Sequence, residues 1–267
     1  MPIFPMTPMA LTALTAPVIL MFAIAPAVQQ EAGAIAPAAA AELLAKSDIA
    51  SQAPESFRAR LRISALHEPL RPPDPSDTME IEVWCSGESR SLVRFLGPKE
   101  KGKYLLRIDD VVWFLAPGSK KPVKVSAAHR LRGSASLDEI LGIRYVRDYV
   151  IDKATEAADA AGPLAVLELA AKSRRAPYPR VRYVVRRATG RPVRAEYLLR
   201  SGKISSTVEF IEWEPGSRPV ARKLILTDTL LSNVRTEITL LEMDERKVPG
   251  ALFDLADPSE RRKLDDQ

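Results

Sequence analysis

The segment from Tyr178 to Met243 constrains the fold most, because short strand-like runs follow one another there with almost no residues of catalytic type. Turn-forming pairs such as Thr189-Gly190 and Ser201-Gly202 separate successive runs. This spacing predicts an antiparallel sheet. A sheet must bury one face, so what covers that face is the question of function. The five predicted strands are Tyr178 to Arg187, Val193 to Arg200, Ile204 to Trp213, Val220 to Asp228 and Val234 to Met243.

The composition is that of a folded, soluble protein, with 46% apolar and 27% charged residues in a chain of 267. The net charge of +5 arises from 39 basic and 34 acidic residues that are mixed along the chain. A nucleic-acid binder gathers its lysines and arginines on one face. Here the arginines alternate with apolar residues in predicted strands, so we expect a solvated outer face and no nucleic-acid partner. The alternative is a patch that meets anionic lipid or another acidic surface.

The N-terminus has the pattern of an export signal. No side chain from Met1 to Gln30 is charged, and Ala10 to Ala27 is largely apolar. Ala25-Pro26-Ala27 offers the small residues that a signal peptidase accepts. We therefore assign residues 1–27 to a cleavable signal peptide and expect a periplasmic protein. The alternative is an uncleaved inner-membrane anchor from Met9 to Val28, which approaches the roughly 20 residues needed to span a bilayer.

The rest of the chain predicts one domain. Residues 28–38 form an Ala- and Pro-rich linker, residues 39–260 form the domain, and residues 261–267 form a charged tail. Within the domain, good helix formers predict a helix first, and period-two alternation then predicts strands. The predicted elements before the five strands above are a helix from Ala38 to Ala50 and strands at Phe57 to Ala65, Met79 to Cys85, Ser91 to Leu96, Tyr104 to Ile108, Val111 to Leu115, Val123 to Ser126 and Leu164 to Ala170.

Residues 127–161 interrupt the strand pattern, with helical spacing around Leu137, Ile140 and Leu141. We interpret this stretch as a helical insertion that covers the sheet. An antiparallel sheet of about eleven strands curls until its apolar face is buried. The predicted fold class is therefore mainly β, a single curved antiparallel sheet forming a half-open β-barrel, with an N-terminal helix and a helical lid insertion.

Residues of catalytic type form no recognisable site. Cys85 shares parity with apolar strand residues, so we interpret it as a buried strand residue. His67 and His129 have no spacing to cysteines or carboxylates that a metal would need. Gly133-Ser134-Ala135-Ser136 lacks the Gly-x-Ser-x-Gly context of a nucleophile elbow, and Asp138-Glu139 is better placed to begin a short helix after Ser136. We expect no enzyme, no catalytic residue, no metal and no cofactor.

The chain resembles the outer-membrane lipoprotein-sorting proteins of the LolA-like family over about residues 40 to 257. The order and spacing of several short motifs carry the resemblance. They are Glu42 to Asp48, Ser56-Phe57, Lys101 to Arg107, Val112 to Pro117, Val125-Ser126, Gly133-Ser134, Thr189 to Glu196, Ser201 to Lys203 and Val248 to Phe253.

The resemblance implies a periplasmic, monomeric carrier with a half-open barrel and a helical lid. Such a carrier binds the acyl chains of lipids or lipoproteins and moves them between the inner and outer membrane. Its partners would be an inner-membrane exporter and an outer-membrane acceptor. The residues predicted to line the concave, ligand-binding side are Leu61, Ile63, Ile81, Val83, Trp113, Leu115, Phe210, Leu224, Leu226, Ile238 and Leu240.

Other readings of the same pattern remain open at this point. Residues of one parity on successive strands also form the filled core of any β-sandwich. A periplasmic sensor or adaptor could use the same fold to bind a partner protein, and it would have a packed interior. A hydrolase with an unfamiliar site is the third alternative.

Overall fold

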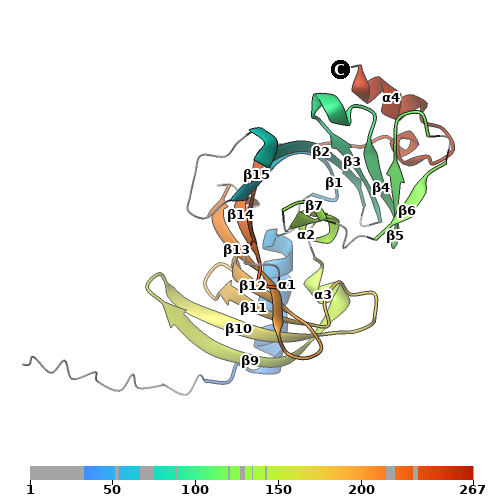
Figure 1. The fold of residues 1–267 in the computed structure, drawn as a ribbon. Coiled ribbons are helices and arrows are strands. Elements are labelled where there is room, and N and C mark those ends of the chain that lie inside the picture. Colours follow the sequence, from blue (N-terminus) through green and yellow to red (C-terminus); the bar gives the residue numbers. More distant parts are fainter. Residues whose placement is uncertain are drawn as a thin grey trace, which may run out of the picture. The chain divides into compact units, whose positions relative to one another are not determined.

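One antiparallel sheet of thirteen strands forms the body of the protein in the computed structural model (Figure 1). The structure describes residues 33–51, 54–66, 75–87, 89–119, 121–126, 130–133, 135–141, 143–214, 220–230 and 234–266. All of these belong to one unit, Ala32–Gln267. The predicted signal peptide and the first part of the predicted linker lie outside the described residues.

The strands follow the chain in two runs that meet in the middle of the sheet. The spatial order is β6-β5-β4-β3-β2-β1-β15-β14-β13-β12-β11-β10-β9. The first and last strands, β1 and β15, are therefore neighbours, while β6 and β9 are the two edges, so the sheet is not closed into a barrel. The bounds are β1 Ser56–Leu66, β2 Thr78–Ser86, β3 Arg90–Phe95, β4 Tyr104–Ile108, β5 Val111–Leu115, β6 Val123–Val125, β9 Tyr149–Asp159, β10 Gly162–Ala171, β11 Arg180–Arg186, β12 Pro192–Leu198, β13 Ile204–Trp213, β14 Ala221–Asp228 and β15 Val234–Glu245.

The predicted fold class is confirmed. All the predicted strands are present with small differences at their ends. The structure adds β9, an eleven-residue strand where the sequence predicts part of the helical insertion. This strand contains several Ala, Glu and Asp residues that disfavour strands, but pairing with β10 overrides that local preference. Its outer edge is also covered, because the amide of Ile35 donates to the carbonyl of Ala154 at 3.0 Å.

Helix α1 (Pro37–Ser51) packs on the sheet with a face that is partly polar. Ala40, Leu44, Ser47 and Asp48 are all buried, and they lie at the i, i+4, i+7 and i+8 positions of one helical face. Ser47 forms a hydrogen bond of 2.9 Å with the hydroxyl of Tyr183. The sequence predicts an apolar stripe at Leu43, Leu44 and Ile49, and it misses the two polar positions. These are tolerated because each has a partner inside the fold.

The insertion between β6 and β9 contains a small hairpin and two short helices. The hairpin consists of β7 (Arg130–Arg132) and β8 (Ala135–Ser136), and the helices are α2 (Leu137–Leu141) and α3 (Tyr145–Asp148). We call this segment the lid. Gly133 at the hairpin turn has φ +55°, and a Cβ there would lie 2.3 Å from the hydroxyl oxygen of buried Thr236 on β15. Glycine therefore permits both the turn and its close approach to the sheet.

The last residues of the chain cover the outer face of β2 to β5. A 3-10 turn (η3, Gly250–Phe253) and helix α4 (Ser259–Asp265) follow β15. Their buried Leu252, Phe253 and Leu264 pack in a second apolar cluster with the outward residues of the strands. Helix α4 lies where the sequence predicts a charged tail, and its Arg261 is buried with its guanidinium donating to the carbonyls of Leu252 and Asp254.

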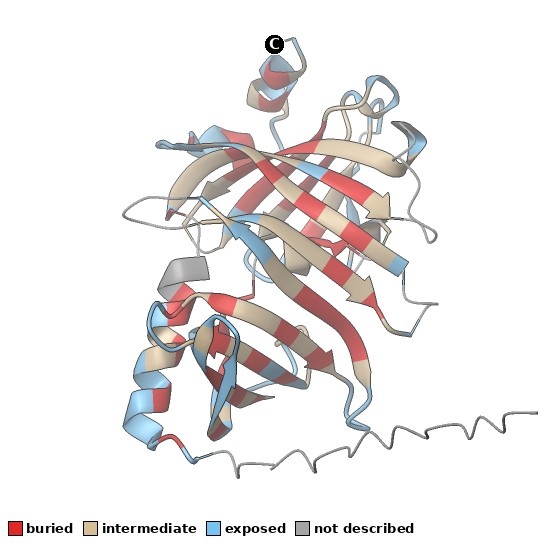
Figure 2. Ribbon diagram, turned by 90° about the vertical axis from the view of Figure 1, so that its left-hand side faces the viewer, coloured by how far each residue is buried: buried red, intermediate tan, exposed pale blue. Residues whose placement is uncertain are grey.

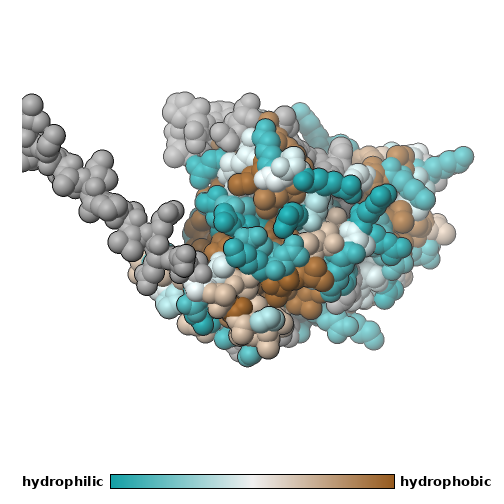
Figure 3. All heavy atoms as spheres, turned by 90° about the horizontal axis from the view of Figure 1, so that it is seen from below, coloured by the Kyte–Doolittle hydropathy of each residue, from teal (hydrophilic) through white to brown (hydrophobic). Residues whose placement is uncertain are grey.

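Burial alternates along strands such as β11, β12 and β15, as expected where one face of the sheet is inside, whereas β2 to β4 have consecutive buried residues (Figure 2). On the face seen from below, hydrophobic side chains lie between hydrophilic ones (Figure 3). Among the residues that the structure describes, none of the helices combines the length and the apolar character needed to cross a membrane. The other short helices are η1 (Pro75–Asp77) and η2 (Pro98–Glu100).

Candidate functional site

An apolar cavity lies between the concave face of the sheet and the lid. Its volume is about 170 Å³. Aliphatic and aromatic side chains from β1, β2 and β13 to β15 form one wall, and lid residues form the other. The principal apolar lining residues are Phe57, Ala59, Leu61, Val83, Ile140, Leu141, Ile143, Tyr145, Tyr197, Val208, Phe210, Leu224, Leu226, Ile238, Leu240 and Met243.

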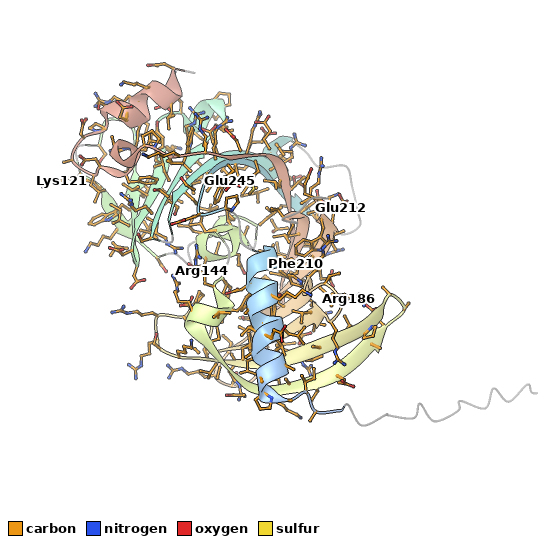
Figure 4. All side chains as sticks on the ribbon, turned by 180° about the vertical axis from the view of Figure 1, so that it is seen from behind. Lys121, Arg144, Arg186, Phe210, Glu212 and Glu245 are labelled. Carbon is orange, nitrogen blue, oxygen red and sulfur yellow. The ribbon has the colours of Figure 1, made fainter. Side chains whose placement is uncertain are left out.

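Seven of the eleven residues predicted to line the concave side do line this cavity. Cross-strand pairing explains why they meet: Leu224 on β14 lies between Phe210 on β13 and Ile238 on β15. Leu61 on β1 pairs with Leu240 on β15 in the same way. Phe210 is labelled in Figure 4. The seven are Leu61, Val83, Phe210, Leu224, Leu226, Ile238 and Leu240.

The other four predicted residues lie elsewhere. Ile63 and Ile81 are fully buried in the main core and do not line the cavity. The prediction for Trp113 and Leu115 is wrong, because they pack in the second cluster on the opposite face of the sheet. Strand β5 has apolar side chains on both of its faces. Its outer face is covered by α4 and η3, and its inner face is covered by the lid. Parity alone therefore could not decide which side faces inward.

The helical wall of the cavity is fixed by a capping box, the reciprocal pair of hydrogen bonds at a helix N-terminus. Glu139 Oε2 accepts from the backbone amide of Ser136 at 2.9 Å and from its hydroxyl at 2.8 Å. Ser136 Oγ accepts in turn from the amide of Glu139 at 3.4 Å. The expected helix start after Ser136 is confirmed. The second carboxylate oxygen, Oε1, accepts from the Tyr178 hydroxyl at 2.9 Å, which ties α2 to the segment before β11.

A cluster of buried tyrosines holds α3 against the half of the sheet formed by β9 to β13. The ring of Tyr145 stacks on Tyr183 with centroids 4.1 Å apart, and its hydroxyl forms a 3.0 Å hydrogen bond with that of Tyr197. Tyr178 stacks on Tyr197 at 4.2 Å. Burial raises the pKa of Tyr145 and of Tyr197 well above 10, so both hydroxyls stay neutral.

Helix α1 also secures α3. Asp48 accepts hydrogen bonds from the backbone amides of Tyr145 at 3.1 Å and Val146 at 3.0 Å, which are the first two residues of α3. A carboxylate in this position satisfies amides that have no partner within the helix. The C-terminal part of the lid is thus anchored to α1 and to the β9–β13 half of the sheet.

A second, polar recess of about 110 Å³ adjoins the cavity. Arg107, Ile143 and Arg144 line both spaces. Arg144 lies in the loop between α2 and α3 (Figure 4). Asp138 lines only the recess, and burial raises its pKa, which Arg107 partly offsets. The cavity therefore passes from an apolar interior to a charged boundary.

The comparisons with known proteins agree with this architecture. The model of a family described as an uncharacterized protein matches residues 87–257, more than half of the chain. The chain belongs to this family. No curated protein matches the chain.

Similarity to solved structures shows which fold this chain has. A LolA superfamily protein from Nitrosomonas europaea has a TM-score of 0.71 and 22% identity, with 80% of this chain and 96% of that chain covered. A DUF1329 family protein from Desulfovibrio piger has a TM-score of 0.68 and 17% identity, covering 82% and 98%. A domain named for outer-membrane lipoprotein sorting, from Vibrio parahaemolyticus, has a TM-score of 0.65 and 13% identity, covering 80% and 95%. The predicted LolA-like fold is confirmed.

In this LolA-like fold, the cavity offers an apolar environment and few reactive groups. No group of three or more His, Cys, Asp or Glu side chains in the described part of the chain is arranged to hold a metal. His67, His129 and Ser134 lie outside the described residues. The arrangement can exclude water from an apolar ligand and can place charge at the boundary.

Sequence reasoning missed Phe57 and Tyr197 as lining residues. Phe57 alternates correctly in β1, so the parity of that strand could have indicated it.

Cys85, predicted as a buried strand residue, is half-buried in the cavity wall and gives a chemical probe of the folded state. Burial raises the pKa of its thiol to about 12, against the opposing effect of Arg107 and Arg144. At pH 8 roughly one thiol in 10,000 would then be ionised, compared with roughly a quarter of free thiols. Because the thiolate is the nucleophile, we expect iodoacetamide to react with Cys85 on the order of 1000-fold more slowly in the folded protein than in urea.

Mass spectrometry of the alkylated protein over time would measure this rate. The rate in the folded state should rise about tenfold per pH unit, because ionisation of the thiol increases with pH until the pKa is reached. Equal rates in the folded and unfolded protein would contradict both the burial and the raised pKa.

Proposed function

We propose that this protein is a periplasmic carrier that holds acyl chains of lipids or lipoproteins in the cavity under the lid and moves them between the inner and outer membrane. The observation that carries the proposal is the cavity itself, with apolar side chains on both its sheet wall and its lid wall. The name of the similar Vibrio parahaemolyticus domain refers to outer-membrane lipoprotein sorting and supports the same class of cargo.

The energetics of acyl chains explain why such a cavity is useful. Exposing an acyl chain to water costs about 0.8 kcal/mol per methylene, or about 13 kcal/mol for a 16-carbon chain. Unassisted passage through an aqueous compartment is therefore slow. A concave apolar wall replaces the membrane interior during transfer, and no catalytic residue is required.

The size of the cavity implies that the lid moves when cargo enters. A dry cavity of about 150 Å³ holds a molecule the size of benzene, and the volume here is about 170 Å³. A complete acyl chain needs more room than this. The lid is the element that can supply it, because α2 forms one wall of the cavity with Ile140 and Leu141, while Asp48 anchors α3 to α1. For α2 to move, the hydrogen bond from the Tyr178 hydroxyl to Glu139 has to break.

Analysis of the bound material would test the proposal. The mature protein, purified from a membrane-containing host, should carry lipid or acylated peptide that native mass spectrometry detects as a discrete added mass. Delipidated protein should recover such a mass when it is incubated with lipid vesicles. Protein that stays free of ligand in both experiments would favour the alternative, an adaptor that binds a partner protein through its surface.

A further inference from the structure

The lining of the cavity differs in character between its two sides. It extends from Arg107 on β4 to Ala221 on β14, and the strands β3, β2, β1 and β15 separate these two residues in the sheet. On the β4 side the cavity adjoins the polar recess, which four aspartates and four arginines line. On the β14 side the one charged lining residue is Arg222, which forms an ion pair with Glu214 at 3.2 Å. The apolar lining residues on that side are Val208, Phe210, Val220, Ala221, Leu224 and Leu226.

The volume of the cavity, about 170 Å³, holds only part of a long acyl chain. Because about 150 Å³ is filled by benzene, roughly six to eight carbons fit, and about half of a 16-carbon chain is left over. Movement of the lid widens the cavity, but the character of the sheet decides on which side the remainder leaves. The β14 side is favoured, since an apolar chain that covers the charges of the recess would remove them from water.

An irregularity in β13 places a tryptophan beside the apolar side. In a regular strand, residues three positions apart point to opposite faces. The pairing of β13 with β14 shifts between Phe210 and Glu212 and again between Glu212 and Trp213, so that Ile211 has no cross-strand partner (Phe210 and Glu212 are labelled in Figure 4). The rings of Phe210 and Trp213 consequently stack, with centroids 5.9 Å apart and 15° between their planes. Bulges re-aim side chains in this way and are frequent next to functional sites.

Trp213 continues the apolar wall beyond the cavity. Its stacking partner Phe210 and its cross-strand partner Ala221 both line the cavity, whereas Trp213 itself does not. Trp213 is half-buried. The guanidinium of Arg191, in the turn between β11 and β12, lies 5.7 Å from the centre of the ring, a distance at which a cation stabilises an indole. The ring is therefore held in place directly outside the lining.

We infer that Phe210 and Trp213 form an apolar exit from the cavity, and that the part of an acyl chain that the cavity does not hold lies against the Trp213 ring. This inference rests on the proposed function and adds to it a binding residue and the side on which the chain leaves. A half-buried indole suits the position, because its ring offers a large apolar surface while its N–H can remain in contact with water.

The length of the ligand chain distinguishes an exit from a purely structural tryptophan. Displacement of cis-parinaric acid, a fluorescent fatty acid, from delipidated protein measures the affinity for octanoate, which fits the cavity, and for palmitate, which exceeds it. In W213A the affinity for palmitate should fall roughly tenfold, the equivalent of about two methylenes returned to water, while that for octanoate stays within about twofold. W213L should retain most of the palmitate affinity, because it keeps an apolar side chain at this position.

Fluorescence quenching locates the chain in the wild type. Bromine quenches tryptophan at short range, and the mid-chain bromines of dibromostearic acid lie near the boundary of the cavity whichever end of the chain enters. Of the three tryptophans, Trp84 and Trp113 pack in the second cluster on the outer face of the sheet. Bound dibromostearic acid, compared with stearic acid, should therefore lower the emission of the wild type and of the control W113F, but not that of W213F.

The outcomes separate the exit from the carrier function. Thermal melting establishes that each variant is folded. The exit is wrong if the wild type binds both acids without quenching, if quenching persists in W213F, or if W213A leaves the affinity for palmitate unchanged. An equal loss of affinity for octanoate and palmitate in W213A would also overturn it, since a structural role affects both ligands alike. In all these cases the carrier function still stands, whereas a wild type that binds none of these fatty acids would overturn the carrier function itself.

Discussion

Replacing Glu82 with alanine is expected to lower the free energy of unfolding by about 3–5 kcal/mol, because it leaves the largely covered Arg94 and the buried Trp84 indole without their shared acceptor. The Glu82 side chain is 1% exposed and accepts from Arg58 at 2.5 Å, from Arg94 at 2.9 Å and from the Trp84 indole at 3.0 Å. The Arg94 side chain is itself only 13% exposed. Without the carboxylate, its charge would stay in the covered outer face of the sheet.

Glu80 on the same strand is the control for this experiment. It pairs with Arg60 at 2.6 Å and Arg62 at 2.9 Å, but its side chain is 24% exposed and both partners are more exposed still. Solvent-exposed ion pairs contribute only about 0–1 kcal/mol, so E80A should lose no more than that. Urea unfolding followed by circular dichroism measures both values. Equal losses in E82A and E80A would show that burial does not distinguish the two carboxylates.

Replacing Leu224 with asparagine is expected to weaken acyl-chain binding by about tenfold or more. Leu224 is half-buried in the cavity wall between Phe210 and Ile238. An amide in this wall loses its water when a chain enters and finds no partner in it, which costs about 1–3 kcal/mol. Each 1.4 kcal/mol corresponds to tenfold in affinity. Titration with cis-parinaric acid measures the change.

The next residue along the strand provides the matched control. Ile225 is also half-buried, but it points to the opposite face, where its cross-strand neighbours are Glu209 and Glu237. I225N introduces the same amide outside the cavity, so affinity for the acyl chain should stay within about twofold of the wild type. If I225N weakened binding as much as L224N, the loss would reflect general disturbance of β14 and not the lining of the cavity.

Period-two alternation predicted most of this sheet, because most strands have one face inside and one in solvent. It failed at β9, where an edge strand with several Ala and acidic residues is held by its partner β10 and by residues 33–35. It also misassigned Trp113 and Leu115, since β5 is covered on both faces. Residues 250–264, which cover the outer face of β5, are far from it in the chain. The sequence of β5 alone therefore does not show that this face is buried.

The cavity could be predicted only in part for a related reason. The sheet wall follows from parity, as Leu61, Leu224 and Ile238 illustrate. The lid wall depends on which side of a short helix faces inward, and α2 has only five residues. The boundary arginines were missed because Arg107 alternates with apolar residues like many solvated arginines. Only the register across β1 to β4 shows that it belongs to the concave row.

The cover on the outer face of β2 to β4 also bears on how the chain is synthesised. A ribosome completes Trp84, Leu92 and Leu106 long before it begins Leu252 and Leu264, which later bury them. During that interval the unfinished chain has apolar side chains on a face that nothing yet protects. Exposed apolar surface of this kind is where chaperones bind and where aggregation begins. Translation of this protein therefore includes a period in which these strands expose apolar side chains that the finished chain buries.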